Sequence, residues 1–542
     1  MYLASGDDGS RLWLRSLATT TSTPLAGTLG ARLPFWSPDG RSIGFFSSGQ
    51  LMRLDLDGGT PQALAPATNG SGGTWNDDGV IVYAPSLTTG LMRVSATGGA
   101  AVAVTTSSAI SKVGPQFLPD GRRFLFFERA ASSTGGAGSI SLGSLDGAAP
   151  TQLTPSDAAG VYLPSVPGSA DPTLLAERAT SGWLVWVRAG SQTLVAQRLD
   201  LAKPALTGEP VTVADGVGHV SAAATGLLAY RSGGSVQRQL TWVDRSGTTQ
   251  GTVGDPDATY LGPRVSPDRR RVVVMRTLQN NQDLWLLDGT WTSRLTFDAN
   301  AELRPVWSPD GTQVMFRMGE GLYQKRTSGA GEPELIHSSD QTKSATSWSA
   351  NGRFVLYHSQ DPQSDSDIWA VPMLGDRTPW VFLKSAFREL HAGFSPDGRW
   401  VTYQSNESGR FEVYVRPFVP PSSDVAANSP AAAASTSVAG GQWQVSTTGG
   451  VFPAWQPDGK ALYYLNPAGS MMAVPITVSG ATLEPGAPVA LFPARIFGGG
   501  VDAQQGRQYD VASDGRFLIN RVLDSAAAPI TLVQNWQPEA KK

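Results

Sequence analysis

A turn motif that recurs along the chain restricts the possible folds more than any other feature of the sequence. The segment PFWSPDGRSIGFF at 34–46 returns in altered form at 115–127, 305–317, 392–404 and 453–465. A catalytic motif would occur once or twice, whereas this one recurs with a period of about forty residues, the size of a propeller blade. We therefore interpret the aromatic-x-Pro-Asp-Gly pattern as a structural repeat.

Each repeat predicts a four-stranded antiparallel unit. Within 34–72, strands are expected at PFWS, RSIGFF, QLMRLDL and PQALA, and turns at SPDG and DLDGG. Proline presets φ in such a turn, aspartate accepts hydrogen bonds from backbone amides, and glycine adopts the positive φ. We expect the aromatic ring to fill the gap between neighbouring blades. The clearest copies are Trp36, Pro38, Asp39 and Gly40; Trp307, Pro309, Asp310 and Gly311; Phe394, Pro396, Asp397 and Gly398; and Trp455, Pro457, Asp458 and Gly459.

The composition favours the same all-β class. The chain has 33 Asp but only 12 Glu, together with 61 Gly and 38 Pro, and these excesses favour turns over helices. Repeat starts fall near 34, 73, 115, 164, 218, 263, 305, 347, 392, 453 and 509. The sequence therefore predicts two tandem six-bladed β-propellers built from four-stranded antiparallel blades.

We place the first propeller at 1–247 and the second at 248–542. A segment rich in Ala, Ser and Pro at 420–442 is expected to be a disordered insertion. The last repeat, with YDVAS, RFLINRV and PITLVQNW, lacks a fourth strand, and TTQGTVG at 248–254 is predicted to supply it and close the second ring. Residue 1 falls just before a second strand, so the first blade is expected to be N-terminally incomplete.

Composition and motifs argue against several classes of function. A net charge of −3 disfavours nucleic-acid binding, and the absence of Cys removes disulfides and thiolate metal sites. No apolar run reaches the length of a membrane span, and no signal peptide is visible. Kinase, G-x-S-x-G, H-E-x-x-H and phosphate-loop motifs do not occur. We predict a monomeric, non-enzymatic chain without a cofactor or bound metal.

Four polar residues before two of the innermost strands are the candidate binding residues. Arg304 and His391 each lie three positions before the aromatic residue of their repeat, and Glu302 and Glu389 lie two positions earlier. These slots are expected near the mouth of the central channel, where propellers commonly hold ligands. The alternative is that they are surface charges that satisfy one another. The four histidines, His219, His337, His358 and His391, lie in different repeats and show no metal-binding spacing.

The repeats resemble the TolB-like, WD-repeat-like propellers of bacteria. They resemble more closely the C-terminal double propellers of certain bacterial membrane-bound serine/threonine protein kinases. The similarity covers essentially the whole chain, and the matching stretches are 23–46, 206–217, 240–247, 413–418 and 440–450. This resemblance implies a sensor outside the membrane, separated here from its kinase domain.

Three functions are compatible with these observations. The first is a non-catalytic binding or scaffold module for a protein, peptide or glycan, as the extracytoplasmic part of a kinase system. The second is a TolB-like envelope accessory that docks partner proteins. The third is the propeller gate of a prolyl-oligopeptidase-type peptidase without its hydrolase domain. The resemblance implies a periplasmic or cell-surface location, whereas the missing export signal implies the cytoplasm if the chain is full length.

Overall fold

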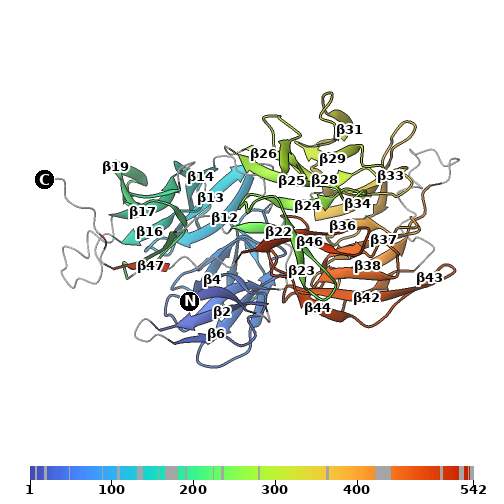
Figure 1. Ribbon diagram of the computed structural model, residues 1–542. Coiled ribbons are helices and arrows are strands. Elements are labelled where there is room, and N and C mark those ends of the chain that lie inside the picture. Colours follow the sequence, from blue (N-terminus) through green and yellow to red (C-terminus); the bar gives the residue numbers. More distant parts are fainter. Residues whose placement is uncertain are drawn as a thin grey trace. The chain divides into compact units, whose positions relative to one another are not determined.

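The computed structural model contains antiparallel β-sheets and, among its described residues, no helix (Figure 1). No segment in that part of the chain is therefore a helix able to cross a membrane. Most of the predicted insertion at 420–442 lies outside the described residues. These are 1–6, 9–16, 21–47, 49–87, 89–106, 110–130, 138–156, 158–164, 181–188, 192–223, 225–232, 237–278, 281–361, 365–421, 441–500, 505–523, 530–534 and 536.

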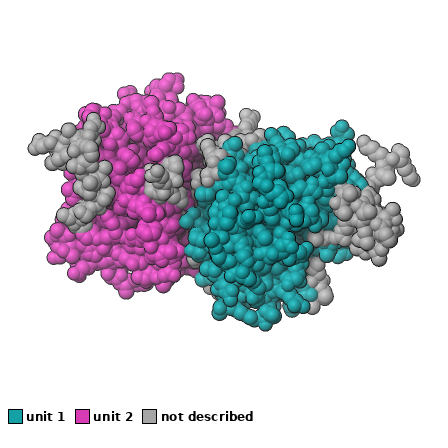
Figure 2. Space-filling view, turned by 180° about the vertical axis from the view of Figure 1, so that it is seen from behind, with its two compact units in different colours: residues 1–4, 11–236, 524–542 teal, residues 5–10, 237–523 magenta. Residues whose placement is uncertain are grey.

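The chain divides into two compact units, coloured separately in Figure 2. The first unit comprises residues 1–4, 11–236 and 524–542, and the second comprises 5–10 and 237–523. The second unit is therefore almost entirely an insertion between two segments of the first.

The described residues of the first unit form six antiparallel sheets, four of them four-stranded. The sheets are β1 (Tyr2–Gly6), β2 (Gly9–Arg15), β3 (Ser22–Pro24); β4 (Arg32–Trp36), β5 (Ser42–Ser47), β6 (Gln50–Asp55), β7 (Gln62–Pro66); β8 (Gly73–Trp75), β9 (Val80–Tyr83), β10 (Met92–Ser95), β11 (Val102–Ala103); β12 (Ile110–Phe117), β13 (Arg123–Ala130), β14 (Gly138–Ser144), β15 (Thr151–Ser156); β16 (Val161–Pro164), β17 (Ser181–Arg188), β18 (Thr193–Asp200), β19 (Ala205–Ala214); and β20 (Val217–Ala222), β21 (Leu228–Ser232), β47 (Ile530–Val533).

The second unit also holds six sheets within its described residues. They are β24 (Leu261–Val265), β25 (Arg271–Leu278), β26 (Asn281–Asp288), β27 (Trp291–Arg294); β28 (Glu302–Trp307), β29 (Gln313–Met318), β30 (Gly321–Arg326), β31 (Glu334–Ser338); β32 (Lys343–Trp348), β33 (Phe354–Asp361), β34 (Asp365–Pro372), β35 (Trp380–Leu383); β36 (Glu389–Phe394), β37 (Trp400–Ser405), β38 (Glu412–Pro417), β39 (Trp443–Gln444); β40 (Val451–Trp455), β41 (Ala461–Leu465), β42 (Ser470–Ser479), β43 (Thr482–Pro485), β44 (Val489–Pro493); and β23 (Thr249–Val253), β22 (Arg238–Val243), β46 (Phe517–Val522), β45 (Tyr509–Val511).

The innermost strands of the second unit form a closed cycle. In order, β24, β28, β32, β36, β40 and β45 each contact the next, and β45 contacts β24 again. Apolar clusters fill the spaces between neighbouring sheets: Val273 and Leu284 of one sheet, for example, pack with Phe316 of the next. This arrangement is consistent with the predicted six-bladed ring, and the six sheets of the first unit agree with the same prediction.

The repeated turn is held by a hydrogen-bond network between its serine and its aspartate. After β28, Ser308 Oγ donates to Asp310 Oδ1 (2.6 Å) and accepts from the amide of Gln313 (2.9 Å). The amide of Thr312 donates to the same aspartate oxygen (3.0 Å). These hydrogen bonds hold the pKa of Asp310 below its usual value, and Gly311 closes the turn with a φ of 69°. The same network recurs in the turns after β4, β24 and β36.

The aromatic residue of the repeat lies between sheets in the second unit. Trp307, Phe394 and Trp455 are each less than a tenth exposed and pack against apolar residues of the preceding sheet. Trp36 differs, because 41% of its surface is exposed. The sheet before it has three strands instead of four, so less apolar surface faces this slot.

The predicted boundary at 247/248 differs from the observed one at 236/237. β22 was assigned to the end of the first propeller, but it pairs with β46 of the second unit. As predicted, 249–253 then forms the outermost strand of that sheet, in the order β23-β22-β46-β45. The segment PITLVQNW also differs from its predicted place, since β47 pairs with β21 of the first unit (Figure 1).

Candidate functional site

A cavity of about 410 Å³ lies on the axis of the second unit. All six innermost strands or their flanking residues contribute to its wall, so it occupies the centre of the closed cycle of strands. A volume of this size suits a small ligand or a short segment of a larger one. One lining residue from each strand in turn is Arg264, Arg304, Ser347, His391, Trp455 and Asp510.

Two β-bulges, one in β28 and one in β36, orient two of the side chains that line the cavity. The pairing register shifts after Leu303 in β28 and after Leu390 in β36. Arg304 and His391 follow these positions with left-handed φ values of 59° and 54°. A non-glycine residue in this conformation costs on the order of 1–3 kcal/mol and persists only where the surrounding structure imposes it. Bulges commonly redirect side chains at functional sites, and here both residues line the cavity.

Two histidines from different repeats meet in the cavity. The ring centroids of His358 and His391 are 5.8 Å apart, and the His391 ring also lies 4.8 Å from that of Phe452. Their spacing in the sequence did not predict that these two side chains are neighbours. Among the described residues, no group of three or more His, Asp or Glu side chains is arranged to hold a metal ion.

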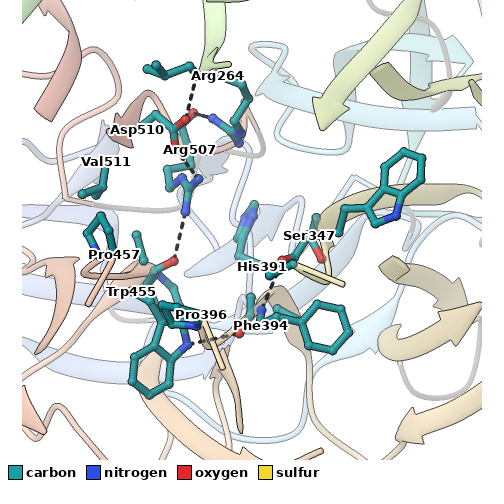
Figure 3. Close-up of a pocket in the computed structure, with 18 of the residues that line it drawn as sticks. Arg264, Ser347, His391, Phe394, Pro396, Trp455, Pro457, Arg507, Asp510 and Val511 are labelled. Carbon is teal, nitrogen blue, oxygen red and sulfur yellow. Dashed lines mark hydrogen bonds and ion pairs between the residues drawn. The ribbon is translucent and has the colours of Figure 1, made fainter. Parts of the chain in front are cut away.

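One side of the cavity carries an arginine–aspartate cluster, formed by Arg264, Arg507 and Asp510 (Figure 3). Arg507 donates to Asp510 Oδ1 (2.7 Å), and the backbone amide of Val265 donates to the other carboxylate oxygen (2.8 Å). Arg264 donates to the carbonyl oxygens of Pro263 (2.7 Å) and Arg507 (3.1 Å). The two guanidinium groups are therefore held in place by the first and last sheets of the ring.

Arginines outnumber carboxylates in the described part of the cavity wall. Burial, together with repulsion from Arg507 and Arg304, lowers the pKa of Arg264 to about 9, and Asp510 opposes this change. Three arginines and one aspartate are among the described lining residues, whereas the whole chain carries a net charge of −3. The excess of arginine is thus a local property of this site.

The four predicted binding residues fall into two different environments. Arg304 and His391 line the cavity, but Glu302 and Glu389 are 0% and 1% exposed at the start of β28 and β36. Glu302 accepts from the amide of Asp298 (3.1 Å), and Glu389 accepts from Ser385 Oγ (2.5 Å). These glutamates accept hydrogen bonds from the segments that lead into their strands, and they do not line the cavity.

Sequence reasoning missed Arg264, Arg507 and Asp510. A signal for two of them was present, because Arg264 and Asp510 occupy one slot of the repeat, immediately before the aromatic slot. Their equivalents in the other sheets of this unit are uncharged: Val306, Ser347, Gly393 and Ala454. Charges of opposite sign in a slot that is otherwise uncharged indicate a local site. The sequence does not reveal which two sheets lie side by side where the ring closes, and that neighbourhood is what brings Arg264 and Asp510 together.

Glu389→Gln is expected to remove part of the pH dependence of the second unit's stability. Burial raises the pKa of Glu389 to about 8 and that of Glu302 to about 7, from about 4.5. A raised folded-state pKa means that the folded protein binds more protons than the unfolded chain, so stability falls as pH rises from about 4.5 to about 8. We expect the urea midpoint of this unit to drop between pH 6 and pH 8.5 in the wild type, and less in the variant.

Glu332→Gln is the matched control for this experiment. Glu332 is exposed on the same unit, so its replacement should leave the wild-type pH dependence intact. An equal drop in midpoint for wild type and Glu389→Gln would show that Glu389 ionises normally.

The ring of antiparallel sheets with a ligand-sized cavity on its axis defines a β-propeller with a central cavity. Residues 226–416 match the family described as PD40, TolB beta propeller domain. This range begins before β21 and ends within β38, so it covers the sheets that begin with β24, β28 and β32 and most of the sheet that begins with β36. Comparison with curated protein sequences gives no match.

Several solved structures resemble the chain at low sequence identity. A putative TolB from Agrobacterium tumefaciens is 15% identical over 54% of this chain and 100% of its own, with a TM-score of 0.40. TolB from Acinetobacter baumannii is 12% identical over 70% of this chain and 82% of its own, with a TM-score of 0.32. The tricorn protease is 13% identical over 90% of this chain and 63% of its own, with a TM-score of 0.31.

Proposed function

We propose that this chain is a non-catalytic binding module that recognises its ligand in the central cavity of the second propeller. The observation that carries the proposal is the convergence of all six innermost strands on one cavity with strained, inward-facing side chains. Such a site is rigid, because its wall residues belong to paired strands or directly flank them. The match to TolB-type propeller repeats supports recognition as the role of the fold.

The cellular setting is proposed from the resemblance of the repeats. The module acts outside the cytoplasmic membrane, as the sensor or interaction part of a bacterial serine/threonine kinase system. The alternative setting is a TolB-like accessory that docks envelope proteins. Immunoblots of membrane fractions distinguish them: a band well above 57.1 kDa supports a kinase-linked protein, and a band at that mass supports the accessory.

Blocking the cavity is expected to abolish recognition. Ala350 is an exposed residue of the cavity wall, so Ala350→Trp places an indole in its mouth without disturbing the core. Peptides selected from a random display library on the wild-type chain should bind this variant at least tenfold more weakly. Ala330→Trp, at an exposed position outside the cavity, should bind them as the wild type does.

Two results would contradict the proposal. Equal binding by wild type and Ala350→Trp would place recognition elsewhere on the chain. Failure of the wild-type chain to enrich any peptide would remove peptide recognition as the function.

A further inference from the structure

Arg264, Arg304 and Arg507 line one side of the central cavity, and they belong to three separate segments of the chain. Asp510 is the one carboxylate among the described residues of the lining. Both oxygens of Asp510 are already engaged, one by Arg507 and the other by the amide of Val265. Asp510 therefore fixes Arg507, whereas Arg264 donates to backbone carbonyls, which do not cancel its charge.

The backbone holds these arginines in place before any ligand arrives. Arg304 has a left-handed φ of 59°. Its guanidinium lies so close to Gly506 that a Cβ on that residue would collide with it. Arg507 also donates to the carbonyl of Pro453 (3.3 Å), which ties the β45 segment to β40. Pre-positioned guanidinium groups favour an anion, because their ordering cost is met during folding.

The opposite side of the cavity is flat and apolar. Phe394, Pro396, Trp455 and Pro457 lie across from the arginine–aspartate cluster in Figure 3. The Trp455 indole is oriented by a hydrogen bond from its Nε1 to the carbonyl of Gly393 (3.3 Å). Phe394 and Trp455 are largely buried between sheets, so Pro396 and Pro457, which are more exposed, present the surface against which a flat apolar group can pack. A ligand that fills the cavity therefore needs a charged end and a flat apolar body.

We propose that the cavity binds a carboxylate group adjacent to a flat apolar group, such as the C-terminus of a peptide ending in an aromatic residue or a free aromatic acid. Two guanidinium groups match the planar geometry of a carboxylate. A carboxylate monoanion also meets less repulsion from Asp510 than a phosphate dianion would. The volume of about 410 Å³ accommodates a single aromatic residue with its terminal group. This inference rests on the proposed function and specifies its ligand class.

Titration calorimetry with matched probes tests the ligand class. N-acetylphenylalanine and N-acetylphenylalaninamide differ only in the carboxylate, so the acid is expected to bind the wild-type chain at least tenfold more tightly. Arg264→Gln should reduce the affinity for the acid to near that for the amide. Arg326→Gln makes the same change of charge at an exposed position outside the cavity and should leave both affinities unchanged.

A second variant, expected to change the affinity in the opposite direction, excludes misfolding as the reason for weaker binding. Asp510→Asn removes the negative charge from the cavity but keeps one side-chain oxygen that can accept from Arg507. We therefore expect it to tighten binding of the acid, which a damaged fold would not do. Comparing 3-phenylpropionate with the tripeptide Gly-Gly-Phe identifies the source. Tighter binding of the tripeptide indicates a peptide C-terminus, and tighter binding of 3-phenylpropionate indicates a free acid; both results support a carboxylate site.

Three outcomes would overturn the inference. They are equal affinity for the acid and the amide, undetectable binding of the acid, and tighter binding of inorganic phosphate than of the acid. If peptides selected on the wild-type chain still fail to bind Ala350→Trp, the proposed function survives these outcomes and only the ligand class is wrong.

Discussion

A chain that ends at Leu523 is expected to lose the fold of the first unit while keeping that of the second. β47 pairs with β21 along Leu228–Arg231, and its loss leaves β20 and β21 as a two-stranded sheet with an open edge. A two-stranded sheet of this kind is marginal in water. The first unit therefore depends on a segment that follows the whole second unit in the sequence.

Side chains at the end of β47 and just after it add to this effect. The ring centroid of Trp536 is 5.5 Å from that of Trp183 on β17. Val533 and Trp536 pack against the buried cluster that includes Val185 and Leu228. Removing a packed tryptophan alone commonly costs about 3–5 kcal/mol when it is fully buried. Because Trp536 is partly exposed, we expect the loss of the strand and this side chain together to reach that range.

Hydrogen exchange measured by mass spectrometry reports the protection of backbone amides in each unit separately. In the chain ending at Leu523, amides of β16–β21 should lose protection, and those of β24–β38 should keep it. A chain ending at Trp536 retains β47 and the tryptophan and serves as the control, with wild-type protection throughout. Unchanged protection of β21 after the longer deletion would show that β47 is dispensable.

Leu240→Asp is expected to unfold the second unit by opening its ring. Leu240 lies on β22, is 0% exposed, and packs with Tyr260, Val272 and Leu518. This cluster joins the sheet completed by β22 and β23 to the neighbouring sheet that begins with β24. A buried carboxylate without a partner adds a large desolvation cost to the lost apolar packing, so we expect more than about 4 kcal/mol of destabilisation.

Thr252→Asp provides the comparison for this substitution. Thr252 lies on β23 of the same sheet, and its side chain is exposed, so an added carboxylate there should change the unfolding midpoint little. We expect the Leu240 variant to lose protection in β24 and β46 while the first unit remains protected. A midpoint within the error of the wild type for Leu240→Asp would mean that β22 does not close the ring.

The Leu240→Asp prediction concerns ring closure, which ties function to stability in the second unit. Arg264 and Asp510 belong to the sheets on either side of the closure, and the amide of Val265 is bonded to Asp510 across it. Opening the ring would separate the cationic wall of the cavity before it unfolded the remaining sheets. Ligand binding at this wall is accordingly expected to stabilise the closure by mass action.

The sequence by itself determined the repeating unit. Proline, aspartate and glycine define each turn through local hydrogen bonds and φ preferences, as Ser308, Asp310 and Gly311 show. The alternation of apolar and polar residues then specifies which face of each strand is buried. These are interactions between residues close in sequence, so the all-β class and the four-stranded sheets follow from the pattern. The outermost strand at 249–253 was predictable too, because the last repeat lacked one.

Only the tertiary structure decided which distant segments pair. β47 lies beside β21 and β22 beside β46, although about three hundred residues separate the partners. A strand's own sequence specifies its buried face but not which open sheet edge it will join. The binding cavity has the same origin: His358 meets His391, and Arg264 meets Asp510, because the sheets form a closed ring. The repeat slot alone predicted Glu302 and Glu389 at the channel mouth, but both side chains are buried and bond to groups at the start of their strands.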